Sequence, residues 1–511
     1  MNRSTLSLIA AVVALGAVTG FAAVSAPDDA APAARTDAAP RLPVERTTLL
    51  CPAPSDSEVA ETAYTAYTPP GEAKAGGDKA AAELRPAAGA TPVKPDDKKP
   101  GKKDPKKPAP AADKPVVPLT QPGKPVTAKA SGGAAPALTG SATGALAPGW
   151  AVQQTTEVAA GSGRGLLGVS CTPPDTDFWF PGASTAKDRQ DYVHLTNPDD
   201  TAAVVDVELY GPGGDLKSQL TEGIPVPPHS SVPVLLSTLT AAAPAPDVTV
   251  HVTTRSGRVG AVVRVADDKA GGDWLPASAD PAGTLVLPGI PADATSVRLV
   301  AFAPGDEDAD LKVQLAGKGG TLTPAGNETL HVKAGMTAAV DLGDLTKGEA
   351  GSLYLRPTDS GSAPVVAALR VVRGKGDKQE VGYIPATGPV GARATAADNR
   401  ATGSTLSLTA PTANAEVKVT ASAGSQGGTA TSKTYSVKAG TTLAVTPPVP
   451  AGLKGSYALT VETVSGGPVH AARTLALPAD GIPMFTVQTL PDDRGTVAVP
   501  RAVQDLSVLE D

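Results

Sequence analysis

Apolar and polar positions alternate in short runs along most of the chain, and these runs are rich in the β-branched residues Val and Thr. Seven such runs follow one another between residues 283 and 388, at 297–302, 311–315, 329–332, 337–342, 353–355, 365–372 and 381–384. Turn-forming Gly, Pro and Asp residues separate the runs, and no apolar pattern with the period of a helix persists for three turns. The pattern predicts seven short β-strands in this part of the chain.

The same pattern occurs three times, at intervals of about 105 residues. The clearest landmark is a turn followed by a strand-like run, at residues 228–234, 333–340 and 438–445. A Ser-Gly turn that leads to an arginine and an earlier proline turn recur at nearly the same interval. Their positions are Ser256 before Arg264, Ser360 before Arg370 and Ser465 before Arg473, and Pro198, Pro304 and Pro411. We therefore expect three copies of one module.

Seven strands in about 100 residues are typical of an immunoglobulin-like β-sandwich. Aromatic residues make up only 3% of the 511 residues, so the cores must be built from small β-branched side chains, which favour sheets. The sequence predicts an all-β protein of tandem immunoglobulin-like sandwiches. The first module with its leading strands is expected at 138–282, the second at 283–388 and the third at 389–491, before a C-terminal tail at 492–511.

The N-terminus carries a membrane-targeting pattern. Arg3 precedes an apolar run at 6–24, and the small residues at 24–26 offer a site for a signal peptidase. The run is also about as long as a minimal membrane span. Residues 1–26 are therefore predicted to be either a cleaved signal peptide or a membrane anchor, and both readings imply export.

Charge is distributed unevenly along the chain. Residues 71–137 hold twelve Lys and one Arg against seven acidic residues, whereas the net charge of the whole chain is -7. No aromatic residue lies between Tyr67 and Trp150, so residues 69–137 are predicted to be a disordered basic segment. This segment is either a cationic arm for anionic wall polymer or lipid head groups, or a solvated spacer. The acidic remainder argues against nucleic acid as a partner.

The chain contains two cysteines, Cys51 and Cys171, and each lies at the end of a short strand-like run. In an oxidising compartment an isolated pair of cysteines is more often bonded than free, so we expect one disulfide. The bond would join an early strand at residues 42–56 to the first module and close a loop that contains the basic segment.

Residues 171–182, which begin at Cys171 and include Asp175, Asp177 and Trp179, resemble a motif of a secreted actinobacterial family named domain of unknown function 5719. The early Cys51-Pro52 element is part of the resemblance. The resemblance implies export and a β-rich body. It also implies a part in the assembly of envelope polysaccharide, because we associate the family with gene neighbourhoods rich in envelope glycosyltransferases.

The same motif is the best candidate for a ligand site. Asp175 and Asp177 flank the densest aromatic cluster of the chain, at residues 178–180 with Trp179 at its centre. Carbohydrate sites combine an aromatic face for the sugar ring with carboxylates for its hydroxyl groups. The alternative is that these aromatic residues close one end of the first module beside the disulfide. Arg189, Asp191, Tyr192 and His194 add polar groups nearby.

The sequence contains partial matches to catalytic and metal-binding motifs, but each match lacks features that the motif requires. Residues 163–168 match the dinucleotide fingerprint, but a strand-like run ending in prolines follows them where a helix is required. Residues 184–187 match a serine-lysine pair without its companion motifs. Asp306, Asp308 and Asp310 have the spacing of a calcium loop but not its later ligands. The five histidines are scattered, so we expect no catalytic residue, no metal and no cofactor.

Two hypotheses for the function follow. The first is a non-catalytic extracytoplasmic protein that acts as a scaffold or partner-binding protein in cell-envelope assembly, with an envelope protein or wall polysaccharide as partner and a membrane contact through residues 1–26 if they persist. The second is a polysaccharide-binding or polysaccharide-modifying protein that uses the region from Asp175 to Phe180.

Overall fold

The computed structural model describes residues 39–71, 80–89, 114–161, 163–220, 222–359 and 363–499. These residues form β-strands and two 3-10 helices of three residues each. The predicted all-β fold built from sandwiches is confirmed. Near the two ends of the described chain, β1 (Arg41–Pro43) pairs with β38 (Thr496–Ala498). The other strands belong to one compact body at residues 43–496. The predicted signal or anchor at 1–26 lies outside the described residues.

The compact body consists of four β-sandwiches, which we call modules A, B, C and D, at residues 43–171, 172–282, 283–388 and 389–496. Module A contains β2 (Arg46–Cys51), β3 (Ala60–Tyr67), β4 (Ala82–Pro86), β5 (Ala88–Gly89), β6 (Val126–Ser131), β7 (Leu138–Thr143), the helix η1 (Gly144–Leu146), β8 (Ala151–Val158) and β9 (Gly165–Ser170). Module B contains β10 (Asp177–Ala183), β11 (Tyr192–Thr196), β12 (Ala203–Gly211), β13 (Gly214–Asp215), β14 (Ile224–Val226), β15 (Ser230–Leu235), the helix η2 (Leu236–Thr238), β16 (Val248–Ser256), β17 (Gly260–Asp267) and β18 (Gly271–Leu275).

Modules C and D have the same organisation. Module C contains β19 (Leu285–Ile290), β20 (Ala294–Phe302), β21 (Ala309–Ala316), β22 (Thr321–Leu322), β23 (Thr329–Val332), β24 (Thr337–Gly343), β25 (Gly351–Pro357), β26 (Val366–Lys375) and β27 (Lys378–Pro385). Module D contains β28 (Ala394–Asn399), β29 (Ser404–Ala410), β30 (Ala415–Ala421), β31 (Gly427–Thr429), β32 (Thr431–Val437), β33 (Thr441–Val445), β34 (Ala451–Lys454), β35 (Tyr457–Gly466), β36 (His470–Ala476) and β37 (Phe485–Thr489).

One strand order recurs in all four modules. The leading sheet, which contains the first strand, has the order β2-β7-β4 in A, β10-β16-β12 in B, β19-β25-β21 in C and β28-β35-β30 in D. The trailing sheet, which contains the last strand, has the order β6-β3-β8-β9, β15-β11-β17-β18, β24-β20-β26-β27 and β33-β29-β36-β37. The first two strands of each module therefore lie in opposite sheets, whereas constant-type immunoglobulin domains hold them in one sheet.

Alternation of small and polar residues explains why these runs form half-buried strands. Along β12 and β21 buried and more exposed positions alternate, as the two-residue period of a strand requires. The strand β26 is different, because its residues 366–369 are all buried. Both of its faces are covered, one by the core of module C and the other by module B. Residues 366–369, which are covered on both faces, are accordingly all apolar, whereas charged residues follow in the later part of the strand.

The structure divides the first part of the chain differently from the sequence prediction. Residues 138–171, which we expected to lead into a first sandwich at 138–282, join the early strands instead: β7 pairs with β2 and β4, and β8 pairs with β3. The expected early strand at 42–56 contains β2 and thus belongs to a fourth copy, module A. The repeat pattern did not reveal this copy because a long insertion interrupts its strands and removes the regular spacing.

The expected disordered segment at 69–137 is folded where the structure describes it. It supplies β4, β5 and β6, and Leu84 of β4 is completely buried in the core of module A. Tyr64 and Trp150, which flank the segment, contribute the aromatic rings of this core, so the segment itself needs none. Residues 72–79 and 90–113 lie outside the described residues.

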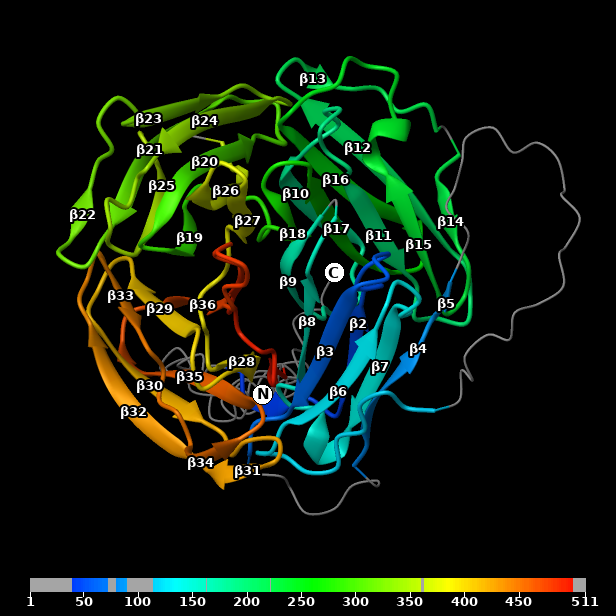
Figure 1. Cartoon of the computed structure of the whole chain (residues 1–511). Coiled ribbons are helices and arrows are strands. Elements are labelled where there is room, and N and C mark those ends of the chain that lie inside the picture. The colour runs from blue at the N-terminus through cyan, green and yellow to red at the C-terminus, as the bar shows by residue number, and fades with distance from the viewer. Residues whose placement is uncertain are drawn as a thin grey trace, which may run out of the picture. The chain divides into compact units, whose positions relative to one another are not determined.

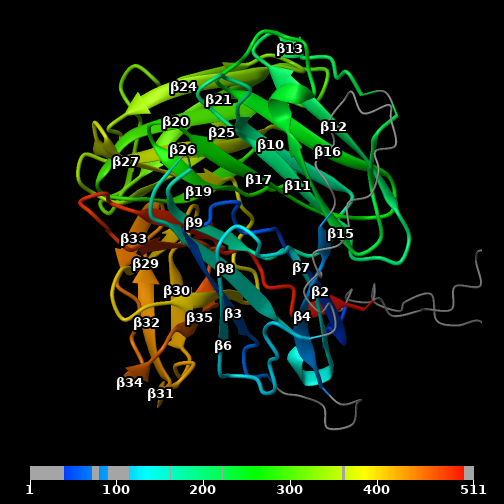
Figure 2. The same cartoon turned by 45° about the vertical axis from the view of Figure 1, so that its right-hand side comes forward.

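The four modules close a ring within the compact body (Figures 1 and 2). Each leading sheet packs against the trailing sheet of the next module, and the leading sheet of D packs against module A. Figure 1 shows the orange strands of module D beside the blue and cyan strands of module A. One contact from each of the four seams is Leu50 with Gly260, Trp179 with Val366, Gly289 with Ala472, and Thr155 with Asp398.

The last strands of the modules, β9, β18, β27 and β37, meet at the centre of the ring. Gly168 of β9 makes this approach possible, because a Cβ atom there would collide with Thr486 and Gln488 of β37. A Cβ atom on Gly165 would likewise collide with Glu380 of β27. The glycines at 163–168 that match the dinucleotide fingerprint therefore serve the close packing of strands.

Candidate functional site

Trp179, the aromatic residue of the predicted site, lies in the seam between modules B and C. Only 8% of its surface is exposed. Its ring stacks on His251 at 3.6 Å between ring centroids and lies 5.4 Å from Phe302 of module C. Val366 and Tyr210 complete this small cluster. Trp179 therefore joins modules B and C, whereas the alternative that the sequence left open placed the aromatic residues at one end of the first module beside the disulfide.

The two predicted carboxylates differ in their surroundings. Oδ2 of Asp177 lies 3.1 Å from Nε2 of His251, and Oε2 of Glu208 lies 3.2 Å from Nδ1 of the same ring. Asp175 pairs through its backbone with Val259 and accepts a hydrogen bond from the backbone of the next residue. The structure thus brings Asp177 and Trp179 together around His251, which the sequence did not connect with the motif because it lies 74 residues away.

The polar residues near this motif, Arg189, Asp191 and His194, make their contacts inside module B. Arg189 binds Asp191 with both ends of its guanidinium, at 3.0 and 2.7 Å, inside module B. His194 is 5% exposed and meets the indole of Trp274 edge-on at 5.2 Å. Burial lowers the pKa of His194 to about 3, so the ring is neutral at ordinary pH. These groups hold module B together and do not extend the Asp177 cluster.

The predicted disulfide is confirmed, since Cys51 and Cys171 are bonded. It joins the end of β2 to the segment that leaves β9. Two backbone hydrogen bonds between Leu50 and Thr172 continue the same junction at 2.8 and 3.1 Å. The bond therefore fastens both ends of module A at the point where the chain enters module B.

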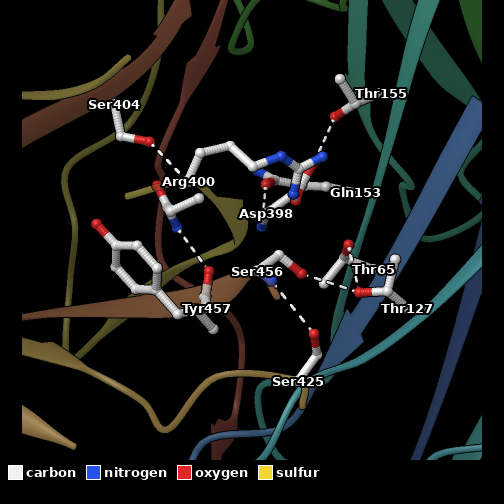
Figure 3. Close-up of polar contacts among 12 residues, drawn as sticks. Thr65, Thr127, Gln153, Thr155, Asp398, Arg400, Ser404, Ser425, Ser456 and Tyr457 are labelled. Atoms are coloured by element: carbon white, nitrogen blue, oxygen red, sulfur yellow. Dashed lines mark hydrogen bonds and ion pairs between the residues drawn. The ribbon is translucent and has the colours of Figure 1, made fainter. Parts of the chain in front are cut away.

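The seam between modules A and D is built from polar side chains (Figure 3). Thr155 of β8 donates a hydrogen bond to Asp398 of β28 at 2.8 Å. The side-chain oxygen of Gln153 accepts hydrogen bonds from the backbone of Asp398 at 2.8 Å and from Arg473 at 2.7 Å. Arg400 binds the other oxygen of Asp398. Five side chains from modules A and D are thus linked by hydrogen bonds where the ring closes.

A second contact in this seam consists of hydroxyl groups. Thr127 of β6 lies 3.2 Å from Thr65 within module A and 2.9 Å from Ser456 of module D. Two of the other seams repeat this arrangement: B–C has the hydroxyl pair of Thr249 and Thr337, and C–D has the cluster of Ser352, Thr409 and Thr442. These hydroxyl contacts lie at equivalent positions of the ring. No sequence motif predicts them.

Two hollows lie along the seam between modules A and D. The first has a volume of about 230 Å³, and its lining includes Lys124, Thr127 and Gln426. The second has a volume of about 150 Å³, and its lining includes Glu61, Thr155 and Arg400. Hydroxyl, amide and charged groups of both signs surround them. This seam is the candidate functional site of the described surface.

The carboxyl groups of Asp273 and Glu380 are buried at the centre of the ring. Asp273 of β18 accepts hydrogen bonds from the backbone of Gly168 at 2.9 Å and from Thr486 at 3.2 Å. Glu380 of β27 accepts one from the backbone of Leu166 at 2.8 Å. Burial raises the pKa of Asp273 well above its ordinary range and that of Glu380 to about 8. Both carboxyl groups therefore favour the neutral form, in which they act as interior structural groups.

Arg164 fastens this centre from module A. Its guanidinium donates hydrogen bonds to the backbone carbonyls of Lys269 in module B at 3.1 Å and of Asp377 and Gln379 in module C at 3.2 and 3.0 Å. It also lies 3.6 Å from Glu380. Arg164, which belongs to the segment that matches the dinucleotide fingerprint, thus connects modules A, B and C.

Among the described residues, no group of three or more His, Cys, Asp and Glu side chains is placed to hold a metal ion. The spaced aspartates of module C have other roles, since Asp310 contacts His331 at 2.9 Å and Asp308 accepts a hydrogen bond from the backbone of Ala334. In the part of the chain that the structure covers, no helix has the length and apolar character for a membrane span.

Comparison with known proteins gives one family. None of the curated proteins matches the chain. The model of a family described as "Family of unknown function (DUF5719)" matches residues 126–448, from β6 of module A into module D. Because this match covers more than half of the 511 residues, the chain belongs to the DUF5719 family.

Proposed function

We propose that this protein is a non-catalytic extracytoplasmic scaffold or partner-binding protein of the cell envelope. The observation that carries the proposal is the use of its polar and aromatic groups for assembly of the ring. Trp179 joins modules B and C, Asp398 and Gln153 join D and A, and Arg164 joins three modules. Groups committed to such contacts are unavailable for a reaction, whereas the ring presents surface to a partner.

Two features support an extracytoplasmic location. The first is the bond between Cys51 and Cys171, because disulfides persist in oxidising compartments and are rare in the cytosol. The second is the apolar run at residues 6–24 with its small-residue cleavage pattern. The resemblance to secreted actinobacterial proteins agrees with both. Residues 1–26 serve as a signal peptide or as an anchor in the cell membrane.

The size of the hollows supports recognition over a surface. Their volumes of about 230 and 150 Å³ lie below the 300 to 1,000 Å³, roughly, of small-molecule pockets. The lining offers hydroxyl, amide and charged groups, which suit an envelope protein or a wall polysaccharide as partner. We place the partner contact at the seam of modules A and D.

Site-specific photo-crosslinking in the cells that produce the protein tests this proposal. A photo-crosslinking residue replaces Gln426, which is exposed at the first hollow, and in a matched control it replaces Thr323, an exposed residue of module C. We expect an adduct with an envelope component from position 426 and none from position 323. A protein that stays in the cytoplasm with reduced cysteines, or an exported protein without any adduct at position 426, contradicts the proposal.

The alternative of polysaccharide binding through Asp175, Asp177 and Trp179 takes second place, because 8% exposure leaves little of the indole for a sugar ring. Asp177→Asn separates the two proposals. Its carboxylate is half exposed, so the fold tolerates the change. Loss of binding in a glycan pull-down at an unchanged melting temperature would favour the alternative, and retained binding would count against it.

A further inference from the structure

The four seams of the ring differ in chemistry. Between B and C, the apolar core of module B continues into residues of module C, among them Val381 and Tyr383. Between C and D, the core of module C continues into Ala472, Phe485 and Val487 of module D. Between A and B, Leu167 and Val169 pack with Val262 and Trp274 in an apolar cluster. Three seams are thus sealed by side chains that exclude water.

The seam between D and A is the exception. Among the described residues, the main apolar clusters of modules A and D share no member, and the same is true of A and B, but the apolar cluster between A and B is continuous and holds six buried residues. Apolar contact is confined to two small clusters, one with Tyr67, Ala397 and Ala458 and one with Leu166, Leu475 and Met484. The polar contacts of Asp398, Gln153 and Thr127 described above fill the space between them. The two hollows lie along the same seam.

Separation of a polar seam requires less free energy than separation of an apolar one. Hydrogen bonds across the seam exchange for hydrogen bonds to water, so each contributes only about 0.5 to 1.5 kcal/mol to closure. An apolar seam loses its full transfer free energy when water enters. In addition, the contacts of the D–A seam join residues that are 243 to 329 positions apart, so the chain itself does not keep the two modules together.

We propose that the ring opens reversibly at the seam between modules A and D while the other three seams stay closed. The disulfide between Cys51 and Cys171 fastens the two ends of module A, and Arg264 of module B holds module A through two hydrogen bonds of 3.0 Å to Asp56, so module A keeps its fold and its contact with module B. Opening separates β8 from β28, and it also separates β9 from β37, which pack together at the centre of the ring. The seam is therefore a gate built into the ring, and this inference does not depend on the identity of the partner.

Thiol labelling tests the gate on the full-length exported protein with its native disulfide intact. Ala397 in the D–A seam and Ala472 in the C–D seam are both completely buried, so Ala397→Cys and Ala472→Cys form a matched pair. A buried thiol reacts with a maleimide only when its surroundings open. We expect the Ala397→Cys variant to react at least tenfold faster than the Ala472→Cys variant.

A second substitution in the same proteins distinguishes gate opening from general unfolding. Thr155→Val removes one hydrogen bond of the D–A seam, and Thr249→Val removes one hydrogen bond between modules B and C. We expect Thr155→Val to accelerate labelling of the Ala397→Cys variant about tenfold, the effect of one hydrogen bond, and Thr249→Val to leave it unchanged. Equal labelling rates of the Ala397→Cys and Ala472→Cys variants, or equal acceleration of both by Thr155→Val, would overturn the proposal.

Discussion

The carboxyl group of Glu380 makes the stability of the ring depend on pH in a direction opposite to that of most carboxylates. Its side chain is fully buried at the centre of the ring, and burial raises its pKa from 4.5 to about 8. The folded chain therefore holds the proton more tightly than the unfolded chain. The resulting contribution to stability is fully present below a pH of about 4.5 and is lost as the pH rises through about 8.

The magnitude follows from the difference between the two pKa values. One pKa unit corresponds to about 1.4 kcal/mol, so the whole change amounts to about 5 kcal/mol. About 3 kcal/mol of this falls between pH values of roughly 5 and 7.5. Glu380→Gln keeps an oxygen for the backbone hydrogen bond of Leu166 but carries no titrating proton. The stability of this variant should lack the contribution.

Urea unfolding, followed by tryptophan fluorescence at several pH values, measures the effect. The free energy of unfolding is compared between the wild type and Glu380→Gln, because titrating groups that do not interact with Glu380 contribute equally to both and cancel in the difference. We expect the wild type to lose about 3 kcal/mol relative to the variant between pH values of roughly 5 and 7.5. A difference that stays constant over this range, or that changes in favour of the wild type at high pH, would refute the reasoning.

Three further predictions concern stability and are measured by the midpoint of urea unfolding. Replacing Cys51 and Cys171 together by Ala removes a crosslink over 120 residues and should lower the free energy of unfolding by about 4 to 5 kcal/mol; an unchanged midpoint would show that the bond constrains nothing. Leu84→Ala, in the basic segment, should cost about 2 to 5 kcal/mol because the side chain is fully buried; a neutral effect would mean that the segment does not belong to the core. Arg473→Met should be nearly neutral or stabilising, whereas Gln153→Ala, which removes the hydrogen-bond acceptor of the buried guanidinium, should cost about 1.5 to 3 kcal/mol; the reverse order would contradict this view of the seam.

The candidate site was only partly predictable. The sequence placed Asp177 and Trp179 together because they are two residues apart, but their partner His251 comes from β16 through sheet pairing. No sequence pattern predicted the D–A seam. Its members, such as Thr155 and Asp398, are ordinary strand residues whose proximity depends on the return of module D to module A.

Most of the fold could be predicted from local sequence patterns. Alternation of small apolar and polar residues with turn residues between them determined the strands, and repetition of that pattern determined three of the sandwiches, because both depend on neighbouring residues and on a constant spacing. Closure of the ring depends on contacts such as that of Arg473 with Gln153, 320 residues apart. Such contacts join residues that are far apart in the sequence, so only the tertiary structure decided the fourth module, the burial of Trp179 and the polar seam.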